Sequence, residues 1–397
     1  MRDDVTLHVR LTKACNADCS YCSSGGRSGQ GAETGPMSVE DYSKALRFIA
    51  SDVLPRMRAL REPQAVGDRM GGVLTIQYVG GEVLTLPRGR LRACVLAARN
   101  AMSPFFDEVI DGVQSNLVGP EERILELQLL FGSRIGTSVS GGGKARTIAG
   151  DPALYDAMAA AGAALLVKRR AVRPGRILVA DADAVSRGAI ETAVADAISV
   201  GAAMTLRPAF EGARPVMEAE TEALAKAFEN AFDLWFMKGS AALSPHIQLL
   251  EARLRESEPN GTGKSLSGCP FQRDCASSSL DLEPDGTLQL CLDMADSGRR
   301  PLGNALLGTF DDEAFLRLAE RRTGLDEKCL ECRWLGSCHG GCMNEGIAAM
   351  DPERRGEPPA RARTKLCDVW KTLFARIDAE IETRGVEAVK AWTERLA

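Results

Sequence analysis

The sequence of 397 residues is poor in histidine and has no excess of positive charge. Its three histidines, His8, His246 and His339, are too few for a histidine-rich zinc or non-heme iron site. The formal net charge is −5 at pH 7, so a basic surface for nucleic acid is not implied. We therefore expect neither a histidine-rich metal site nor a nucleic-acid partner.

Long apolar segments are also missing. The longest uncharged apolar run near the middle of the chain, residues 157–167, is far too short to span a bilayer. Residues 1–4 carry acidic side chains and lead directly into a strand-like segment, so no secretory signal is visible. We expect a cytoplasmic protein without a membrane partner.

Cysteine, in contrast, is abundant, with twelve residues. Disulfides are not expected in a compartment that keeps thiols reduced, and the spacing of these cysteines favours metal ligation. Three lie near the N-terminus and eight in the last third of the chain. The remaining one, Cys94, falls in a helical pattern at 91–96, so we expect it to be a buried core thiol.

The first half of the chain alternates strand-like and helix-like segments. The expected strands, rich in Val, Ile and Leu, are 6–11, 73–79, 109–114, 135–139, 177–180 and 203–206. The expected helices between them are 39–53, 88–102, 121–130, 152–161 and 189–200. Such alternation predicts a parallel sheet covered by helices, with the chemistry at the carboxyl ends of the strands.

The composition changes after a long helical stretch at 216–254. A linker is expected at 258–263, and beyond it cysteine, glycine and aspartate become dense while hydrophobic periodicity weakens. This composition predicts a small domain organised around metal clusters, which replace part of a hydrophobic core. A final polar helix is expected at 368–397.

The N-terminal cysteines lie in the loop that follows the first expected strand. Cys15, Cys19 and Cys22 have the spacing C-x3-C-x2-C. Three thiolates in so short a segment can hold one face of a [4Fe–4S] cluster and leave the fourth iron without a protein ligand. That iron can chelate the amino and carboxylate groups of S-adenosylmethionine (SAM). The alternative, a zinc site, prefers four ligands, and no fourth cysteine or histidine is near.

With Tyr21 as its aromatic residue, the motif C-x3-C-x-aromatic-C resembles the signature of the radical SAM superfamily. The resemblance implies a partial (β/α)6 barrel in which SAM is cleaved to a 5′-deoxyadenosyl radical that abstracts hydrogen from a substrate. It also implies that Tyr21 belongs to the cofactor site. A low-potential electron donor, such as flavodoxin or ferredoxin, is the implied partner.

The second expected strand ends in Gly80-Gly81-Glu82, which is similar to the GGE element of this superfamily. In the family, the backbone and carboxylate of this element hold the SAM amino group, so the resemblance assigns all three residues to SAM binding. Relatives usually continue with Pro-Leu, whereas this chain has Val83-Leu84. Away from the end of a strand, Gly-Gly-Glu would be an ordinary turn.

The third expected strand ends in Gln114-Ser115-Asn116. This segment is similar to the Gln-Thr-Asn-Gly of the peptide-modifying branch of the superfamily. The resemblance places Ser115 and Asn116 in the cofactor site. Leu117 stands where that branch has glycine, so the chain departs from the pattern at this position.

After the fourth expected strand, Ser138 and Arg146 match family positions that contact the ribose and carboxylate of SAM. Relatives often carry aspartate where this chain has Ser140, so that carboxylate is missing here. The glycines at 141–143 and the following Lys144 do not have the spacing of a phosphate-binding loop. We therefore expect no phosphate loop in this segment.

The eight later cysteines follow a second pattern. From Cys275 the spacing is C-x10-G-x4-C, a gap, C-x2-C-x5-C-x3-C, a second gap and a final cysteine, with Asp285-Gly286 at an expected hairpin turn. This pattern resembles the SPASM extension of radical SAM enzymes, and eight thiolates suffice for two fully ligated [4Fe–4S] clusters. The resemblance implies auxiliary cluster I on Cys269, Cys275, Cys291 and Cys342, and auxiliary cluster II on Cys329, Cys332, Cys338 and Cys367. Zinc ribbons remain the alternative, because C-x2-C is also a common zinc spacing.

Two fully ligated clusters have no open iron, so electron transfer suits them better than substrate binding. They can also staple a small domain, and the two roles are compatible. Asp293 follows Cys291 by two residues. In sulfatase-maturing relatives the proposed proton acceptor is an aspartate directly after the equivalent cysteine, where this chain has Leu292. Asp293 is therefore a candidate catalytic base, with a solvated loop carboxylate as the alternative.

The resemblance implies four regions along the chain. They are a radical SAM barrel at 1–215, a helical linker at 216–265, a SPASM domain at 266–370 and a C-terminal helix at 371–397. The first strand begins at once, so no N-terminal peptide-recognition domain is expected.

Enzymes of this architecture mostly oxidise or crosslink residues of peptides and proteins, as anaerobic sulfatase-maturing enzymes and ribosomal-peptide maturases do. The resemblance therefore implies an oxidoreductase that matures a peptide or protein. A radical dehydrogenase or epimerase that acts on a small molecule such as a sugar or cyclitol is one alternative. A protein that carries its clusters for electron transfer or as a scaffold, without SAM chemistry, is the other.

Overall fold

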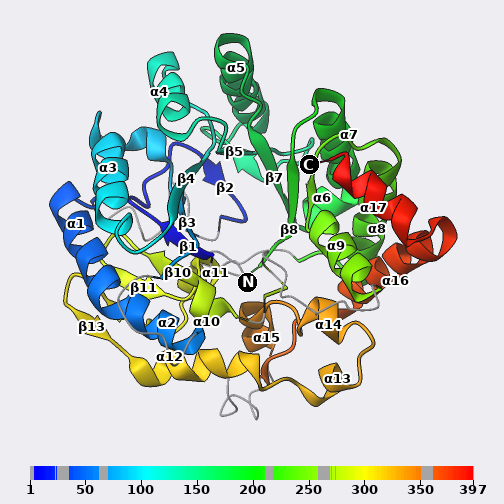
Figure 1. Cartoon of the computed structure of the whole chain (residues 1–397). Helices are drawn as coiled ribbons and strands as arrows, with labels where there is room; N and C mark the ends of the chain where they lie inside the picture. Colours follow the sequence, from blue (N-terminus) through cyan, green and yellow to red (C-terminus); the bar gives the residue numbers. More distant parts are fainter. Residues whose placement is uncertain are drawn as a thin grey trace.

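The structure is a computed structural model that describes residues 4–22, 24, 35–61, 70–210, 218–257, 269, 271–272, 274–349 and 361–396. Within these residues, the main sheet has eleven strands. Adjacent, parallel and in chain order are β1 (Val5–Val9), β3 (Val73–Tyr78), β4 (Glu108–Ser115), β5 (Ile135–Ser138), β7 (Gly175–Ala180) and β8 (Met204–Pro208). These strands curve around a common interior (Figure 1), so the predicted partial (β/α)6 barrel is confirmed.

Helices cover the outer face of this sheet (Figure 1). They are α1 (Val39–Phe48), α2 (Leu54–Arg61), α3 (Arg90–Met102), α4 (Glu121–Phe131), α5 (Pro152–Arg170), α6 (Ala182–Ser186) and α7 (Ala189–Val200). Helix α1 begins where expected, because the Ser38 side chain accepts a hydrogen bond from the Asp41 amide. The predicted helix at 39–53 does not end at residue 53, because a π-helical turn at Ile49–Val53 leads directly into α2.

Helix α5 is longer than the predicted helix at 152–161. It continues through Gly162 to Arg170. A Cβ atom at Gly162 would lie 2.2 Å from the carbonyl oxygen of Leu117, so only glycine allows the helix to approach the loop after β4. Packing against a distant loop, which the local pattern does not encode, therefore explains the extra length.

Alternation along the strands separates an apolar outer face from a polar interior. In β1, Val5, Leu7 and Val9 are buried against the helices, while the side chains between them face the interior. His8 pairs in register with Gln77 of β3, and both side chains line the interior cavity. The interior is therefore polar, unlike the layers of branched apolar side chains that fill closed barrels.

Beyond β1, the sheet continues with strands from the cysteine-rich part of the chain. β10 (Ser279–Leu282) pairs parallel to β1, and β11 (Thr287–Gln289), β12 (Gly303–Asn304) and β13 (Thr309–Phe310) follow in antiparallel order. The expected hairpin turn at Asp285-Gly286 is confirmed, with Gly286 at φ +85°. A shared sheet thus joins the cysteine-rich region to the barrel.

At the opposite edge, β9 (Leu243–Ser244) pairs parallel to β8 and separates α8 (Thr221–Lys238) from α9 (His246–Glu256). The single helical stretch predicted at 216–254 is therefore wrong in its middle part. Pro245 precedes α9, and a proline has no amide with which to continue a helix. The linker predicted at 258–263 lies outside the described residues.

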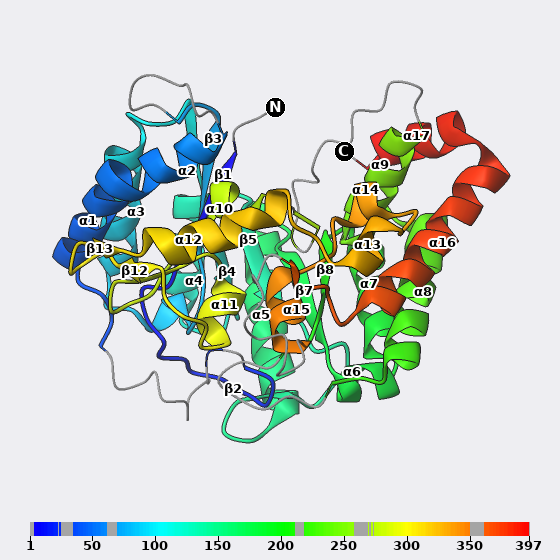
Figure 2. The ribbon, with the colours of Figure 1, turned by 90° about the horizontal axis from the view of Figure 1, so that it is seen from below.

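A second hydrophobic core forms where α8 and α9 meet the C-terminal helices. α16 (Cys367–Arg384) and α17 (Val386–Glu394) replace the single helix predicted at 368–397, because Gly385 at φ +84° interrupts it. Figures 1 and 2 show α16 alongside α8. Trp370, which is 1% exposed, packs among other aromatic rings in this core.

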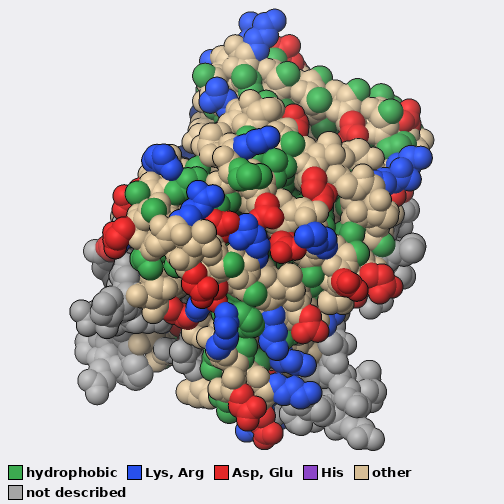
Figure 3. Space-filling model, turned by 90° about the vertical axis from the view of Figure 1, so that its right-hand side faces the viewer, with side chains coloured by type: hydrophobic (Ala, Val, Ile, Leu, Met, Phe, Trp, Pro, Cys, Tyr) green, Lys and Arg blue, Asp and Glu red, His purple; other side chains and the backbone are tan. Residues whose placement is uncertain are grey.

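The surface that includes α16 and α17 carries acidic and basic side chains next to each other (Figure 3). Arg376 of α16 forms ion pairs with Asp233 of α8 and with Glu380. Among the helices of the described ranges, none has the length and apolarity needed to cross a bilayer. The domain boundaries at 215, 265 and 370 remain predictions.

All twelve cysteines lie within the described residues, and none forms a disulfide. Cys94 is fully buried on α3, as predicted for a core thiol. The other eleven gather at three places in the fold, and these are described below.

Candidate active site

A cavity of about 410 Å³ opens at the carboxyl ends of the barrel strands. Its lining includes every residue that the sequence assigned to the N-terminal cluster and to SAM binding: Cys15, Cys19, Tyr21, Cys22, Gly80, Gly81, Glu82, Ser115, Asn116, Ser138 and Arg146. The volume is in the range of small-molecule and cofactor pockets. The fold thus brings together, at one place, the segments that follow β1, β3, β4 and β5.

The loop after β1 presents the three N-terminal cysteines to this cavity. The Cys22 amide donates to the Cys19 carbonyl and closes a turn, and the Cys15 sulfur accepts a hydrogen bond from the Ala17 amide at 3.4 Å. Burial raises the pKa of Cys15 to about 12, and the nearby Glu82, Cys19 and Cys22 act in the same direction. Three thiols are therefore crowded where a multivalent cationic group would offset their charge as thiolates.

The donor set fits an iron–sulfur cluster better than a single ion. Among the residues that the structure describes, no three Cys, His, Asp or Glu side chains converge closely enough to hold one metal ion. A [4Fe–4S] cube needs no such convergence, because each cysteine binds a different iron. A single zinc ion would need four donors around one point.

Both glycines of the GGE element are required by close contacts. A Cβ atom at Gly80, whose φ is +73°, would lie 2.1 Å from Nε of Arg10. At Gly81, whose φ is +53°, it would lie 2.5 Å from the Thr12 carbonyl oxygen and 2.6 Å from that of Ala14. The element therefore packs directly on the cysteine loop, which side chains at these positions would push away.

The Glu82 carboxylate connects the ends of β3 and β4. It is 1% exposed and accepts hydrogen bonds from the Leu84 amide at 3.0 Å, the Ser115 hydroxyl at 2.8 Å and the Asn116 amide at 2.7 Å. Burial raises the pKa of Glu82, and these hydrogen bonds oppose part of that rise. The carboxylate therefore orders the strand ends that surround the cavity.

Leu117 keeps a backbone conformation that normally favours glycine. It is fully buried at φ 57°, in the left-handed region. Gly162 of α5 faces it, and a Cβ atom there would lie 2.9 Å from Cβ of Leu117. The next residue back, Asn116, donates to the Asn16 side chain at 2.7 Å and ties this loop to the cysteine loop. Glycine at position 162 thus leaves room for Leu117 in this conformation.

Arg146 is held between two tyrosine rings at the cavity wall. Its guanidinium carbon lies 5.1 Å from the ring centroid of Tyr21 and 5.7 Å from that of Tyr155. The strand β2 (Asp18–Cys19) pairs with β6 (Arg146–Thr147) and sets the arginine beside the cysteine loop. Sequence reasoning missed Tyr155, which comes from the first turn of α5. The only feature of the sequence that could have pointed to Tyr155 is its aromatic ring, nine residues after Arg146.

The candidate base Asp293 lies on α11 (Leu292–Asp296), beside the cavity. Its side chain is 17% exposed and forms an ion pair with Arg207 at the end of β8, with 2.5 Å between the two groups. Arg207, Leu292 and Asp296 line the cavity, and Asp293 lies behind them. Asp293 is therefore a helical, ion-paired carboxylate and not a solvated loop carboxylate.

A buried charge network next to the cavity was missed by sequence reasoning. Arg10 is fully buried and pairs with Glu283 and Asp296 at 2.8 Å each, and Lys13 pairs with Glu283 at 2.7 Å. Because Glu283 follows β10 and Asp296 ends α11, the network fastens the cysteine-rich region to β1. The only signal in the sequence was the charged residue Arg10 in an expected strand, at a position that alternation turns toward the interior.

The later cysteines form two groups, each assembled from separate segments. The first quartet consists of Cys269, Cys275, Cys291 and Cys342, whose thiols interact electrostatically with one another. Asp293 and Arg207 belong to the same electrostatic neighbourhood, so the first quartet borders the cavity. Burial raises the pKa of Cys275 to about 11.

The second quartet consists of Cys329, Cys332, Cys338 and Cys367, which line one small cavity together with Trp334, Trp370 and Phe374. Burial raises the pKa of Cys338 to about 12, and the other three thiols act in the same direction. The two groups have the membership that the resemblance implied. That each group holds an iron–sulfur cluster remains a prediction.

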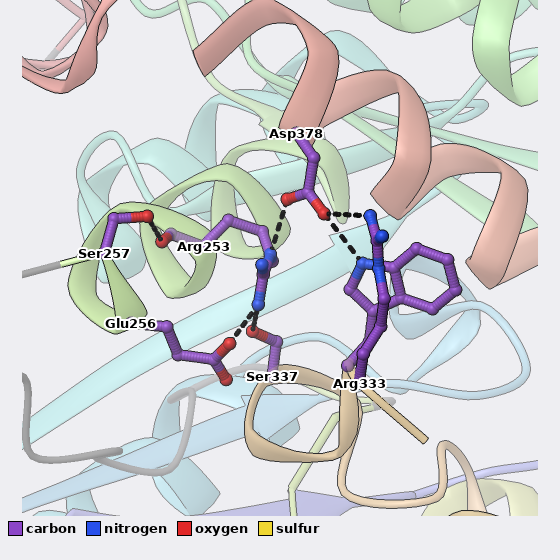
Figure 4. A network of polar contacts seen from close by, with 7 residues as sticks. Arg253, Glu256, Ser257, Arg333, Ser337 and Asp378 are labelled. Atoms are coloured by element: carbon purple, nitrogen blue, oxygen red, sulfur yellow. Dashed lines mark hydrogen bonds and ion pairs between the residues drawn. The ribbon is translucent and has the colours of Figure 1, made fainter. Parts of the chain in front are cut away.

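Asp378 of α16 holds in place the segment 332–338 of the second quartet, which includes the short helix α14 (Leu335–Cys338). Its carboxylate accepts hydrogen bonds from Arg253 at 2.7 Å, Arg333 at 3.0 Å and the Trp334 indole at 2.9 Å (Figure 4). The guanidinium of Arg333 also stacks over the Trp334 ring, 4.4 Å from its centroid. The Asp378 carboxylate thus connects α9, the segment 332–338 and α16.

Arg321 lies between the two quartets and was also missed by sequence reasoning. It is 2% exposed and donates to the carbonyl oxygens of Ala362 at 2.6 Å and Gly341 at 3.2 Å. Its guanidinium interacts with thiols of both quartets: Cys275 and Cys342 of the first, and Cys329 and Cys338 of the second. A Cβ atom at Gly340 would lie 2.4 Å from it. The arginine therefore braces the short segment that connects the quartets.

No protein-family model and no curated protein matches the sequence. Among solved structures, the chain is similar to anSMEcpe with bound AdoMet, with a TM-score of 0.72 and 17% identity over 99% of this chain and 98% of that one. A structure of anSMEcpe with AdoMet and a Cp18Cys peptide has a TM-score of 0.69 and 16% identity, over 96% and 98% of the two chains. SuiB from Streptococcus suis, bound to S-adenosylmethionine, has a TM-score of 0.57 and 14% identity, over 92% and 77%. These likenesses confirm the predicted fold, a partial barrel continued by a cysteine-rich region.

Proposed function

We propose that this chain is a radical SAM maturase of a peptide or protein. It cleaves SAM to a 5′-deoxyadenosyl radical, abstracts hydrogen from a peptide residue, and oxidises or crosslinks that residue. The observation that carries the proposal is the cavity itself, whose lining includes all the residues that four separate sequence motifs point to. Motifs that occurred by chance would not meet at one place at the strand ends.

A peptide or protein substrate is supported by the similar structures. anSMEcpe, an anaerobic sulfatase-maturating enzyme, was solved with a Cp18Cys peptide, and SuiB was solved with its precursor peptide SuiA. The polar interior, with His8, Gln77 and Gln114 along the strands, offers hydrogen-bonding groups for a peptide residue.

Cys15, Cys19 and Cys22 would hold the SAM cluster, and the two quartets would hold auxiliary clusters I and II, giving three [4Fe–4S] clusters in all. When bound, the first cluster supplies the electron that cleaves SAM, and the auxiliary clusters supply acceptors for the electron that the substrate loses. A low-potential donor such as flavodoxin or ferredoxin would reduce the first cluster. Such clusters are best maintained in a reducing compartment, so we place the protein in the cytoplasm.

The residues of the chain divide the work of binding SAM. The backbone of Gly80 and Gly81 lies against the cysteine loop and is placed to bind the amino group. Arg146 is buried, cationic and held between tyrosine rings, so it suits the carboxylate. Ser138 at the end of β5 offers a hydroxyl to the ribose. Glu82 keeps these strand ends in register through its three hydrogen bonds.

Formation of 5′-deoxyadenosine by the anaerobically reduced, fully loaded protein with SAM is the decisive test. We expect turnover in the natural chain and none in Cys15→Ala, whereas the matched control Cys94→Ala, outside the cavity, keeps it. Iron content of about twelve atoms per chain is expected from three cubes, against about eight in Cys15→Ala/Cys19→Ala/Cys22→Ala. No 5′-deoxyadenosine from fully loaded protein would overturn the radical reading, and about four irons with bound zinc would overturn the auxiliary clusters.

The substrate class is tested by deuterium transfer. Peptides deuterated at Ser, Cys or other residues are supplied together with SAM, and the deuterium content of 5′-deoxyadenosine is measured by mass spectrometry. Transfer from a peptide supports the proposal. Transfer from a deuterated sugar or cyclitol, with none from any peptide, would replace it by the small-molecule alternative.

A further inference from the structure

His8 lines the cavity and belongs to none of the cluster and SAM motifs. It lies on the interior face of β1, opposite Asp281 of β10 in the sheet register. No motif includes His8, because it lies in β1, before the first cysteine of the C-x3-C-x2-C motif. His246, by contrast, is fully buried in the second core, away from this cavity.

The His8 imidazole is neutral and keeps a lone pair. Burial lowers the pKa of His8 to about 4, against the influence of Asp293, and the cations Arg207 and Arg10 add to the decrease. Within the described part of the chain, Nδ1 is inaccessible and has no hydrogen-bond partner. The His8 side chain nevertheless forms part of the cavity lining, so the ring can be reached from the cavity. The backbone of Leu280 favours the protonated ring, so it would stabilise a proton once one is accepted.

The carboxylates around the cavity are already engaged. Asp293 and Asp296 are paired with arginines, and Glu82 accepts three hydrogen bonds. Asp281, opposite His8, is fully buried, and burial raises its pKa well above the usual range. The first three of these carboxyl groups are therefore paired or hydrogen-bonded, and burial disfavours the ionised form of the fourth, whereas the imidazole can take up a proton.

We propose that His8 is the catalytic residue that accepts the proton released by the substrate during its oxidation, an inference that rests on the proposed function. A substrate C–H bond breaks when its hydrogen atom passes to the 5′-deoxyadenosyl radical and forms 5′-deoxyadenosine. The carbon radical must then lose one electron, and an oxidised auxiliary [4Fe–4S] cluster, which the first quartet would hold beside the cavity, would supply the acceptor. At the same time the proton on an adjoining oxygen, sulfur or nitrogen moves to His8. A new bond forms between the carbon and that heteroatom, and the substrate has lost two hydrogens and two electrons.

The first test separates hydrogen abstraction from oxidation, with a peptide that passes deuterium to 5′-deoxyadenosine. His8→Gln is expected to form 5′-deoxyadenosine and to take up deuterium at the natural rate. Product per 5′-deoxyadenosine should fall about 100-fold, because the amide cannot accept the proton. In His8→Ala, added imidazole should restore this ratio. An unchanged ratio in His8→Gln, or a parallel loss of 5′-deoxyadenosine and product, would overturn the proposal.

A second test does not depend on turnover. Diethyl pyrocarbonate modifies accessible neutral imidazoles, and peptide mapping of the holoenzyme shows which histidines react. His8 should react and should be protected by SAM with the peptide, whereas the matched control His246 should stay unmodified. Freeze-quenched His8→Gln should also accumulate a substrate radical in its EPR spectrum. An unreactive His8, or one unprotected by the peptide, contradicts the inference, while absence of 5′-deoxyadenosine from the natural chain contradicts the proposed function instead.

Discussion

The two cysteine quartets lie in the same region of the chain but in different surroundings. The first is bordered by charged groups, with the Arg207–Asp293 pair between it and the barrel cavity. The second is enclosed by Trp334, Trp370 and Phe374 and sits against the second hydrophobic core. Side chains next to the second quartet reach the surface, since Arg333 is 65% exposed.

These surroundings fit a division of labour between the quartets. A cluster held by the first quartet, next to the cavity, could take an electron from a substrate radical. A cluster held by the second quartet, beside the exposed Arg333, could pass that electron on to another protein. Reduction potentials depend on charge, hydrogen bonds and solvent around the cluster, so the two sites should differ in potential. Arg321, which interacts with thiols of both quartets, lies where it would influence both.

Replacing one cysteine of each quartet should give the largest difference between them. We expect Cys291→Ala to lower product per 5′-deoxyadenosine by about 100-fold or more, because the substrate radical loses its nearby electron acceptor. Cys332→Ala should keep the product of a single turnover and lose later turnovers, because the electron cannot leave. Rapid-quench product analysis distinguishes the two patterns. Equal losses in single turnover would mean that the quartets do not differ in role.

The second core that supports the second quartet should weaken in acid. His246 is fully buried, its ring lies 5.6 Å from that of Phe228, and a ring nitrogen bonds the Phe228 carbonyl at 2.9 Å. Burial lowers the pKa of His246 from 6.5 to about 4, so the folded state binds fewer protons than the unfolded state. The contribution of His246 to the free energy of unfolding is fully present above its pKa in the unfolded chain, and it is lost as pH falls toward its pKa in the folded protein. It amounts to about 2 kcal/mol between about pH 7 and about pH 5.

His246→Phe tests this, because phenylalanine keeps the stacking and removes the titration. Denaturant unfolding at the two pH values should show a smaller acid loss in the variant, by about 2 kcal/mol. The same dependence on pH in both proteins would show that His246 is not a neutral buried group in the natural chain.

Much of the barrel could be predicted from local sequence pattern. Each expected strand of the first half lies within two residues of an observed one, because period-two alternation of buried side chains sets strand positions locally. Helix 189–200 was predicted with its observed bounds, because its apolar residues recur with the period of a helix. The errors arose where distant contacts decide. Helix α5 passes through Gly162 because of Leu117, and β9 forms because β8 offers a free edge.

The site divides in the same way. Cysteine spacing and strand-end motifs pointed to the residues that line the cavity, because ligands on one short loop are close in sequence as well as in space. Tyr155, His8 and Arg321 could not be identified from sequence motifs. Their neighbours in the site are distant in sequence and become close only through strand pairing or the packing of helices. Arg10 and its two carboxylates likewise join segments from opposite ends of the chain.

The hydrogen bonds that position the second quartet should be removable without disturbing the first quartet. Asp378→Asn removes the charge that accepts hydrogen bonds from Arg253, Arg333 and Trp334, and we expect it to cost about 2 kcal/mol of unfolding free energy. About four irons should be lost faster than the rest on chelator challenge. Glu382→Gln, exposed on the same helix, is the matched control and should behave as the natural chain. Uniform iron loss would show that Asp378 does not act on one quartet alone.

The smallest expected effect tests whether the quartets share an electrostatic environment. Arg321→Gln removes a buried cation that interacts with thiols of both quartets. Loss of this charge should disfavour the more negative, reduced form of the cluster that each quartet would hold. EPR-monitored titration should show both auxiliary potentials lowered by roughly 60 mV, equivalent to about 1.4 kcal/mol for one electron. Arg321→Lys, which keeps the charge, should shift them less, and Arg317→Gln, at a position 61% exposed, should leave them unchanged. A shift confined to one cluster would assign Arg321 to that quartet and would leave the other with a separately tuned potential.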